Sequence, residues 1–325
     1  IYVLSFLIIL FLIKNIFILL IVIYKAKFIE TLRKKLSKKL HLKYLGQNYE
    51  FFVNSNTSEL IRNLYQEVPK IMKGIDGILI LLTEFFILIG LSLILLYISP
   101  LTTIIVIAVT LIFFLIYVYL TRKKIFNLGK QDQILYSSLM KETQQGYGNF
   151  KEILIYQLKD IFFYQYANLL VKYCRNNKIL SIYQQFPRIL FEQIGIILVV
   201  GVSIFIFVQE PSKVKAIGII GVYAYAFFRT VPLINKLIVN TQLIVFVKPS
   251  LDIINDEFKN KSEKDFKSEI DEPIEFKKNI DLQGVYFSAK NKSNQILKKV
   301  NLNIKKNSKI GIVGESGSGK STLLN

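Results

Sequence analysis

The stretch ILILLTEFFILIGLSLILLYISPLTTIIVIAVTLIFFLIYVYL, residues 78–120, decides the fold. It contains one charged residue, Glu84, and one proline, Pro100, with an apolar segment on each side of that proline. A helix needs roughly 20 apolar residues to cross about 30 Å of hydrocarbon. The stretch therefore predicts a hairpin of two transmembrane helices, roughly 71–98 and 101–120, whose tip carries no charge.

The rest of the chain repeats this apolar character. Further runs cover residues 1–24, 189–208 and 216–247, so we expect about five membrane spans. Across the 325 residues, 52% are hydrophobic and 20% are charged, and the mean hydropathy is +0.41. These values exclude a secreted disulfide scaffold and a disordered chain, and they predict a membrane-embedded all-α helical bundle.

Basic residues set the expected orientation. The polar stretches 25–70 and 122–178 each contain ten basic and four acidic residues, whereas the hairpin tips contain almost none. Positively charged loops remain in the cytoplasm, so both long stretches are expected there. Alternation then places residue 1 near the outer face and Val247 near the inner face.

The two cytoplasmic stretches also have a helical pattern. Apolar residues recur at helical spacing in 59–72 and in 149–174, which predicts that the membrane helices continue into the cytosol. Short breaks are expected at 46–49 and 144–149, where glycine lets the chain reverse.

The net charge of +19 and the pI of about 9.7 allow two interpretations. Membrane topology explains them better than nucleic-acid binding, because the basic residues flank the spans and form no groove with stacking aromatics. We therefore expect no nucleic-acid partner. A single cysteine, Cys174, and a single histidine, His41, exclude a disulfide framework and make zinc-hydrolase or Ser-His-Asp chemistry improbable.

The composition changes after residue 250. Residues 1–250 form the predicted membrane domain, 251–273 read as a charged linker, and 274–325 begin a soluble domain with strand-like alternation. Within that domain, KIGIV (309–313) is expected to be a short strand and TLLN (322–325) the start of a helix.

Between these two segments lies GESGSGKS, residues 314–321, which fits the phosphate-binding pattern G-x-x-x-x-G-K-[ST] completely. Glycines let the backbone wrap round a phosphate, the lysine reaches the β and γ phosphates, and the following hydroxyl holds Mg²⁺. The alternative is a Gly-Ser-rich turn, which such a complete match disfavours. The sequence thus predicts an α/β P-loop NTPase domain that uses ATP and Mg²⁺, with Ser321 as the metal ligand. The predicted nucleotide-binding residues are Gly314, Glu315, Ser316, Gly317, Ser318, Gly319, Lys320, Ser321 and Thr322.

Taken together, the bundle, linker and GESGSGKSTLL segment resemble an ABC exporter half-transporter with a type I exporter membrane domain. Four segments, QNYEFFVNSNTSELIRN (47–63), GNFKEILIYQ (148–157), PRILFEQIG (187–195) and AFFRTVPLINK (226–236), look more particularly like bacterial lipid-linked oligosaccharide and polysaccharide flippases. The resemblance covers essentially the whole chain. It implies a homodimer in the inner (plasma) membrane, with six membrane helices and a cytoplasmic nucleotide-binding domain in each chain.

By that resemblance, the visible spans correspond to the second to sixth helices, and short coupling helices are expected near 46–56 and 148–157. Ala289 stands where the family usually has an adenine-stacking aromatic residue, so Tyr286 becomes the candidate adenine contact. Ser308 and Lys309 replace the customary Gly-Glu. Because the chain opens at Ile1 without Met and no hydrolytic motif follows Asn325, we expect a fragment that does not hydrolyse ATP alone.

Charges within the apolar runs are the remaining signal. A charged residue at a helix centre costs about 2.5–3.5 kcal/mol on insertion scales, so such residues face a polar cavity or one another. We expect a basic belt for a diphosphate headgroup, which the resemblance makes the substrate group. The alternatives are that Arg188 lies at the membrane interface and that Glu84 or Glu192 pairs internally with these bases. The belt candidates are Lys14, Arg188 and Arg229, and the other charged candidates near helix centres are Glu84, Glu192 and Lys236.

The sequence therefore favours ATP-driven flipping or export of a lipid-linked oligosaccharide or polysaccharide precursor across the bacterial inner membrane. Two alternatives stay open. One is an ABC exporter of a drug, lipid or peptide, and the other is a non-catalytic, truncated membrane protein with a vestigial P-loop.

Overall fold

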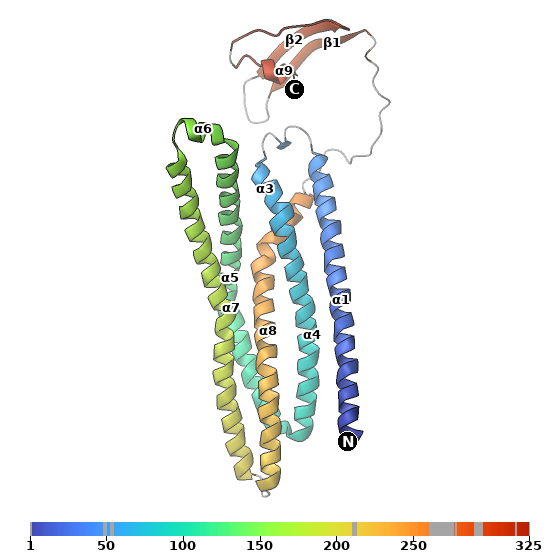
Figure 1. Cartoon of the computed structure of the whole chain (residues 1–325), viewed down its shortest axis with the longest axis vertical. Helices are drawn as coiled ribbons and strands as arrows, with labels where there is room; N and C mark the ends of the chain where they lie inside the picture. The colour runs from blue at the N-terminus through green and yellow to red at the C-terminus, as the bar shows by residue number, and fades with distance from the viewer. Residues whose placement is uncertain are drawn as a thin grey trace. The chain divides into compact units, whose positions relative to one another are not determined.

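The structure is a computed structural model that describes residues 2–47, 51–52, 55–209, 213–259, 276, 278–288, 295–315 and 317–324. The chain divides into two compact units, residues 1–265 and 266–325. The first is helical and the second contains a small sheet (Figure 1).

Five long helices build the first unit, and all five are long and apolar enough to cross a membrane. Two short helical segments, α3 (Thr57–Arg62) and the π-helix η1 (Asn63–Glu67), lead into α4, and the short helix α6 (Phe150–Ile155) joins α5 to α7. The long helices are α1 (Tyr2–Leu45), α4 (Val68–Ile98), α5 (Pro100–Gly148), α7 (Lys159–Gln209) and α8 (Lys213–Lys259).

The predicted helical hairpin is present. Ser99 is extended, with φ −153° and ψ 93°, and Pro100 starts α5 at a position where its missing N–H costs nothing. Figure 1 shows the start of α1 at the same end of the unit as this turn, and α6 at the opposite end. The helices thus alternate in direction as the charge distribution predicts.

The polar stretches continue the membrane helices, as expected. Helix α5 runs for 49 residues without interruption, so the chain reverses after Gly148. Helix α8 continues to Lys259, so the first nine residues of the segment predicted to be a linker are helical, and residues 260–275 lie outside the described part. The predicted short helix near 148–157 is found as α6. Within the one predicted near 46–56, Phe51 and Phe52 are helical, and residues 48–50 and 53–54 lie outside the described part.

Helix α8 packs against α4, α5 and α7, and lies between α4 and α7 in Figure 1. Two glycines permit the closest approaches. A Cβ on Gly129 of α5 would lie 2.2 Å from the Phe246 carbonyl oxygen of α8, and one on Gly195 of α7 would lie 1.7 Å from the Phe227 ring. These positions hold the helices at a separation that only glycine allows.

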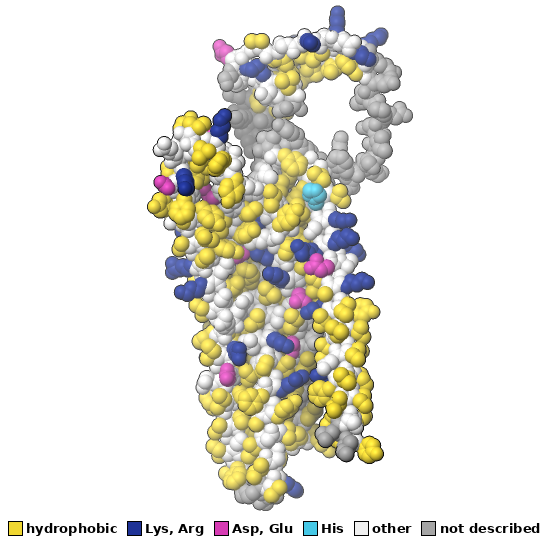
Figure 2. All heavy atoms as spheres, in the orientation of Figure 1, with side chains coloured by type: hydrophobic (Ala, Val, Ile, Leu, Met, Phe, Trp, Pro, Cys, Tyr) yellow, Lys and Arg dark blue, Asp and Glu magenta, His cyan; other side chains and the backbone are white. Residues whose placement is uncertain are grey.

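The membrane half of α1 packs differently. None of its most apolar window is buried, and it joins the bundle only further along the chain. There Leu40 and Tyr44 enter a core with Val68, Met72 and Val247. Figure 2 shows basic side chains gathered along this later part of α1, and hydrophobic side chains over the earlier part.

Where α3, η1, α4 and α5 meet, buried charged and polar side chains form a cluster. Glu67, which is 0% exposed, lies 3.6 Å from Arg62 and 3.7 Å from Lys70 and accepts a 3.2 Å hydrogen bond from Gln133. Lys70 also binds Asp132 at 2.5 Å. Because unpaired buried charges are costly, these contacts fix the relative positions of the helices that supply them.

The second unit contains two antiparallel strands, β1 (Asn279–Ser288) and β2 (Gln295–Lys305), followed by the short helix α9 (Lys320–Leu324). The strand expected at 309–313 is not formed. Among the described residues the sheet consists of β1 and β2, so this segment has no neighbouring strand to pair with, and its Val313 is 95% exposed.

Candidate functional site: a phosphate-binding loop and membrane-embedded charges

The predicted phosphate-binding loop joins the extended segment 309–313 to α9. Gly317 and Gly319 have φ of 85° and 89°, a region that favours glycine. A Cβ on Gly319 would also approach Ile296 and Leu297 of β2 at 3.2–3.3 Å. Glycine at this position therefore lets the loop turn and rest directly on β2.

Lys320 lies across the loop that precedes it. Its Nζ donates hydrogen bonds to the carbonyl oxygens of Gly314 at 2.7 Å and Glu315 at 2.6 Å. The Ser318 amide donates to the Glu315 carbonyl at 3.2 Å and closes the turn. The Lys320 ammonium is thus bound by neutral carbonyl oxygens inside the turn. Phosphate oxygens in their place would also supply a negative charge, which carbonyl oxygens lack.

The other predicted nucleotide residues differ in how the structure describes them. Ser321 is exposed in the first turn of α9, and Thr322 is half-buried beside it. Ser316 and Ala289 lie outside the described residues. Tyr286, the candidate adenine contact, is 57% exposed on β1.

The three predicted belt cations lie on three different helices. Lys14 of α1, Arg188 of α7 and Arg229 of α8 are all exposed in the single chain. The Lys14 Nζ lies 4.8 Å from the Phe11 ring centroid. Among the described residues, no hydrogen bond or ion pair brings the three cations together, so the belt remains a prediction.

One pair of membrane charges does form. Glu84 of α4, 6% exposed, accepts a hydrogen bond of 2.7 Å from Lys236 of α8. The sequence singled out both residues and allowed an internal pair for Glu84, but it could not choose the partner, which lies 152 residues away. The exposed Glu192 forms no ion pair with the described part of the chain.

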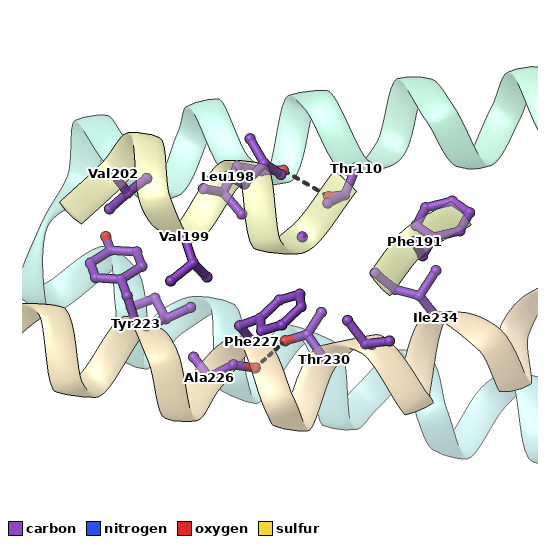
Figure 3. Close-up of a pocket in the computed structure, with 14 residues that line it drawn as sticks. Thr110, Phe191, Leu198, Val199, Val202, Tyr223, Ala226, Phe227, Thr230 and Ile234 are labelled. Carbon is purple, nitrogen blue, oxygen red and sulfur yellow. Dashed lines mark hydrogen bonds between the residues drawn. The ribbon is translucent and has the colours of Figure 1, made fainter. Parts of the chain in front are cut away.

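An apolar crevice lies between α5, α7 and α8 (Figure 3). Phe191, Val199 and Phe227 line it, and the hydroxyls of Thr110 and Thr230 bind carbonyls of their own helices at 2.8 Å. Its polar atoms are therefore satisfied, and the crevice resembles a hydrocarbon-filled gap between helices.

Tyr223, at one end of this crevice, links α8 to the α4–α5 turn. Its hydroxyl forms hydrogen bonds with Thr102 and, at 2.8 Å, with Thr103, and donates to the Ser99 carbonyl at 3.2 Å. Sequence analysis missed this cluster and the one round Glu67. For the Tyr223 cluster the available signal was polar residues inside apolar segments, whereas the residues round Glu67 lie in the polar stretches 25–70 and 122–178.

The architecture is thus that of a multi-pass membrane protein with the beginning of a P-loop nucleotide-binding domain. The chain belongs to the ABC transporter family. The ABC transporter transmembrane region family matches residues 1–231, and the ABC transporter family matches residues 297–325.

Individual proteins agree with this assignment. The chain is 22% identical to the subtilin transport ATP-binding protein SpaT of Bacillus subtilis over 318 residues. The aligned region covers 93% of this chain and 49% of SpaT. It therefore spans about half the length of this relative. The solved structure of a bacterial Atm1-family ABC exporter with ATP bound has the same fold, with a TM-score of 0.73 at 13% identity over 92% of this chain and 52% of that one.

Proposed function

We propose that this chain provides the membrane domain and the phosphate-binding loop of an ATP-driven ABC exporter that acts as a homodimer in the bacterial inner membrane. One observation supports the proposal most: a complete phosphate-binding loop, with Lys320 held 2.7 Å from the Gly314 carbonyl, follows five apolar helices in the same chain. A vestigial loop would not need to keep both positive-φ glycines and the lysine.

The loop residues fit a nucleotide with Mg²⁺. Lys320 would exchange its two carbonyl partners for phosphate oxygens, backbone amides of 314–319 would surround the phosphates, and the Ser321 hydroxyl would hold the metal ion. When bound, ATP supplies the free energy of phosphoanhydride hydrolysis. Tyr286, exposed on β1, is proposed as the adenine contact in place of an aromatic residue at 289.

For the substrate we propose a lipid-linked oligosaccharide or polysaccharide precursor with a diphosphate headgroup. Lys14, Arg188 and Arg229 are exposed on apolar helices and form no ion pair within the described part of the chain. Such cations are unfavourable in hydrocarbon, and they favour a water-accessible cavity with anionic ligands. Two copies of each in a dimer would double this charge.

The test is reconstitution of the complete protein in proteoliposomes with a fluorescent polyprenyl-diphosphate oligosaccharide. We expect ATP-dependent flipping, stimulation of ATP hydrolysis by the lipid, and loss of both in Lys320→Ala. The triple variant Lys14→Ala, Arg188→Ala, Arg229→Ala should lose flipping while still binding ATP. Turnover of ATP that is indifferent to the lipid, together with no flipping, would contradict the substrate.

Peptide export is the second candidate, because SpaT is named as a subtilin transport protein. The same proteoliposomes distinguish the two. A peptide exporter would respond to a cationic peptide and not to the diphosphate lipid, and removal of the three cations would leave peptide transport intact.

A further inference from the structure

We propose that Glu84 is an internal competitor of the anionic substrate, and that it sets how much negative charge a headgroup needs in order to bind. The inference rests on the proposed function and concerns the ion pair that Glu84 forms with Lys236. The two partners of this pair have different surroundings, and that difference carries the argument.

The carboxylate is enclosed and the ammonium is accessible. Only 7% of the Glu84 side chain is exposed, against 56% for Lys236. The Glu84 Oε1 accepts the 2.7 Å hydrogen bond from Lys236, whereas the Oε2 is buried and has no hydrogen-bond partner among the described residues. One oxygen of the Glu84 carboxylate therefore has no hydrogen-bond partner among the described residues. The cation that this carboxylate binds is Lys236.

Lys236 is also part of a cationic surface. It lies seven residues after Arg229 on α8, which places the two side chains on the same side of the helix and about 10 Å apart along its axis. Both are exposed, and Arg229 forms no ion pair with a described residue. This surface thus has two cations within reach of one extended headgroup, and Glu84 neutralises one of them.

A headgroup that uses both cations must displace Glu84 from the Lys236 ammonium. A monophosphate can satisfy Arg229 but offers little charge to replace the Glu84 carboxylate at Lys236. A diphosphate has enough oxygens and charge to bind both cations with charge-assisted hydrogen bonds. Competition from Glu84 therefore favours diphosphates over monophosphates, and specificity arises from a repulsive element as well as an attractive one.

The experiment uses the complete protein in phosphatidylethanolamine vesicles that contain increasing mole fractions of undecaprenyl diphosphate or undecaprenyl phosphate. The readout is the mole fraction that half-maximally stimulates ATP hydrolysis. In Glu84→Gln we expect this value to fall for both lipids, by about tenfold for the monophosphate, which is the effect of one hydrogen bond to a charged group. The preference for the diphosphate should shrink accordingly.

Two further variants separate competition from simple structural support. Glu192→Gln removes an exposed carboxylate from α7 and should shift neither value. The exchange Glu84→Lys, Lys236→Glu keeps an ion pair but places the negative charge on the accessible side, so it should abolish stimulation by the diphosphate. If the exchange variant is stimulated normally, the pair is structural and the inference is wrong.

Failure of the inference can be told apart from failure of the proposed function. If the unaltered protein responds to neither lipid, the lipid-linked substrate is wrong, and the competitor role is lost with it. If it responds to the diphosphate but Glu84→Gln keeps the same half-maximal values and the same preference, the function stands and only the role of Glu84 is refuted.

Discussion

Substituting Gly129 by alanine should destabilise the helical unit, because the main chain of α8 occupies the place of the new methyl group. The added Cβ would lie 2.2 Å from the Phe246 carbonyl oxygen. Ordinary carbon–oxygen contacts are about 3.3 Å, so α5 and α8 would have to separate by about 1 Å. No rotamer change can relieve the clash, since both atoms are fixed to backbone.

The contacts of α5 with α7 next to Gly129 also limit how far α5 can move away from α8. Leu128 is 2% exposed, and its carbonyl accepts a 3.1 Å hydrogen bond from Asn176 of α7. Helix α5 is thus held against α7 on one side and α8 on the other. Overpacking at such a site costs typically 1–3 kcal/mol, and we expect about 2 kcal/mol here. At about 2.1 cal/mol/K per residue over the 265 residues of the helical unit, that lowers the Tm by about 3–4 °C.

Thermal unfolding in detergent, followed by the remaining monodisperse fraction, measures this effect. Gly90→Ala is the matched control, because it is a helical glycine of α4 whose added Cβ meets nothing within 4 Å. It should be neutral or stabilise by up to about 1 kcal/mol through helix propensity. If Gly129→Ala melts at or above the temperature of Gly90→Ala, the described α5–α8 contact is wrong.

Three other predictions follow from named contacts. Lys320→Ala should weaken binding of a fluorescent ATP analogue by roughly 10- to 100-fold, the effect of one or two charge-assisted hydrogen bonds, and unchanged affinity would contradict the site. Tyr223→Phe removes the buried hydroxyl between α8 and the α4–α5 turn, and should lower stability by about 1–2 kcal/mol in the same melting assay, whereas the exposed Tyr225→Phe should not. Lys70→Met leaves the buried Asp132 carboxylate without its cation and should cost about 3–5 kcal/mol, seen as loss of folded protein on size exclusion; a normal yield and Tm would argue against the pair.

The parts of the fold that depend on local sequence could be predicted. Membrane spans follow from the length and hydropathy of a continuous segment, so the helices on both sides of Pro100 and their continuation through the polar stretches are confirmed. The phosphate-binding loop was recognisable because its glycines and Lys320 must keep fixed spacing within eight residues. In both cases all the determining residues lie within one short stretch.

Contacts between distant segments could not be predicted in this way. The partner of Glu84 is on another helix, and the sequence gave no means of choosing Lys236 among four basic candidates, which also included Lys14, Arg188 and Arg229. The strand predicted at 309–313 is wrong for a related reason. Its alternation of apolar and other residues is typical of a strand, but a strand forms only where a neighbouring strand offers hydrogen bonds. The π-helix before α4 has no sequence signal that we recognise.

The polar contacts of α8 also bear on how the helical unit can move. Polar contacts hold α8 to its neighbours at three points along its length. Tyr223 binds the α4–α5 turn, Lys236 binds α4, and Ser250 binds Gln133 of α5. Sliding α8 past its neighbours would expose or break all three contacts in a low-dielectric environment, where lost polar partners are costly. In the membrane half of α1 none of the most apolar window is buried, and Lys25 pairs with Asp76 of α4 near its inner end. A conformational change is therefore favoured when α4, α5 and α8 move as one block and only the membrane half of α1 moves against them, because the later part of α1 is held by the buried 2.9 Å hydrogen bond from the Asn63 amide to the Tyr44 hydroxyl.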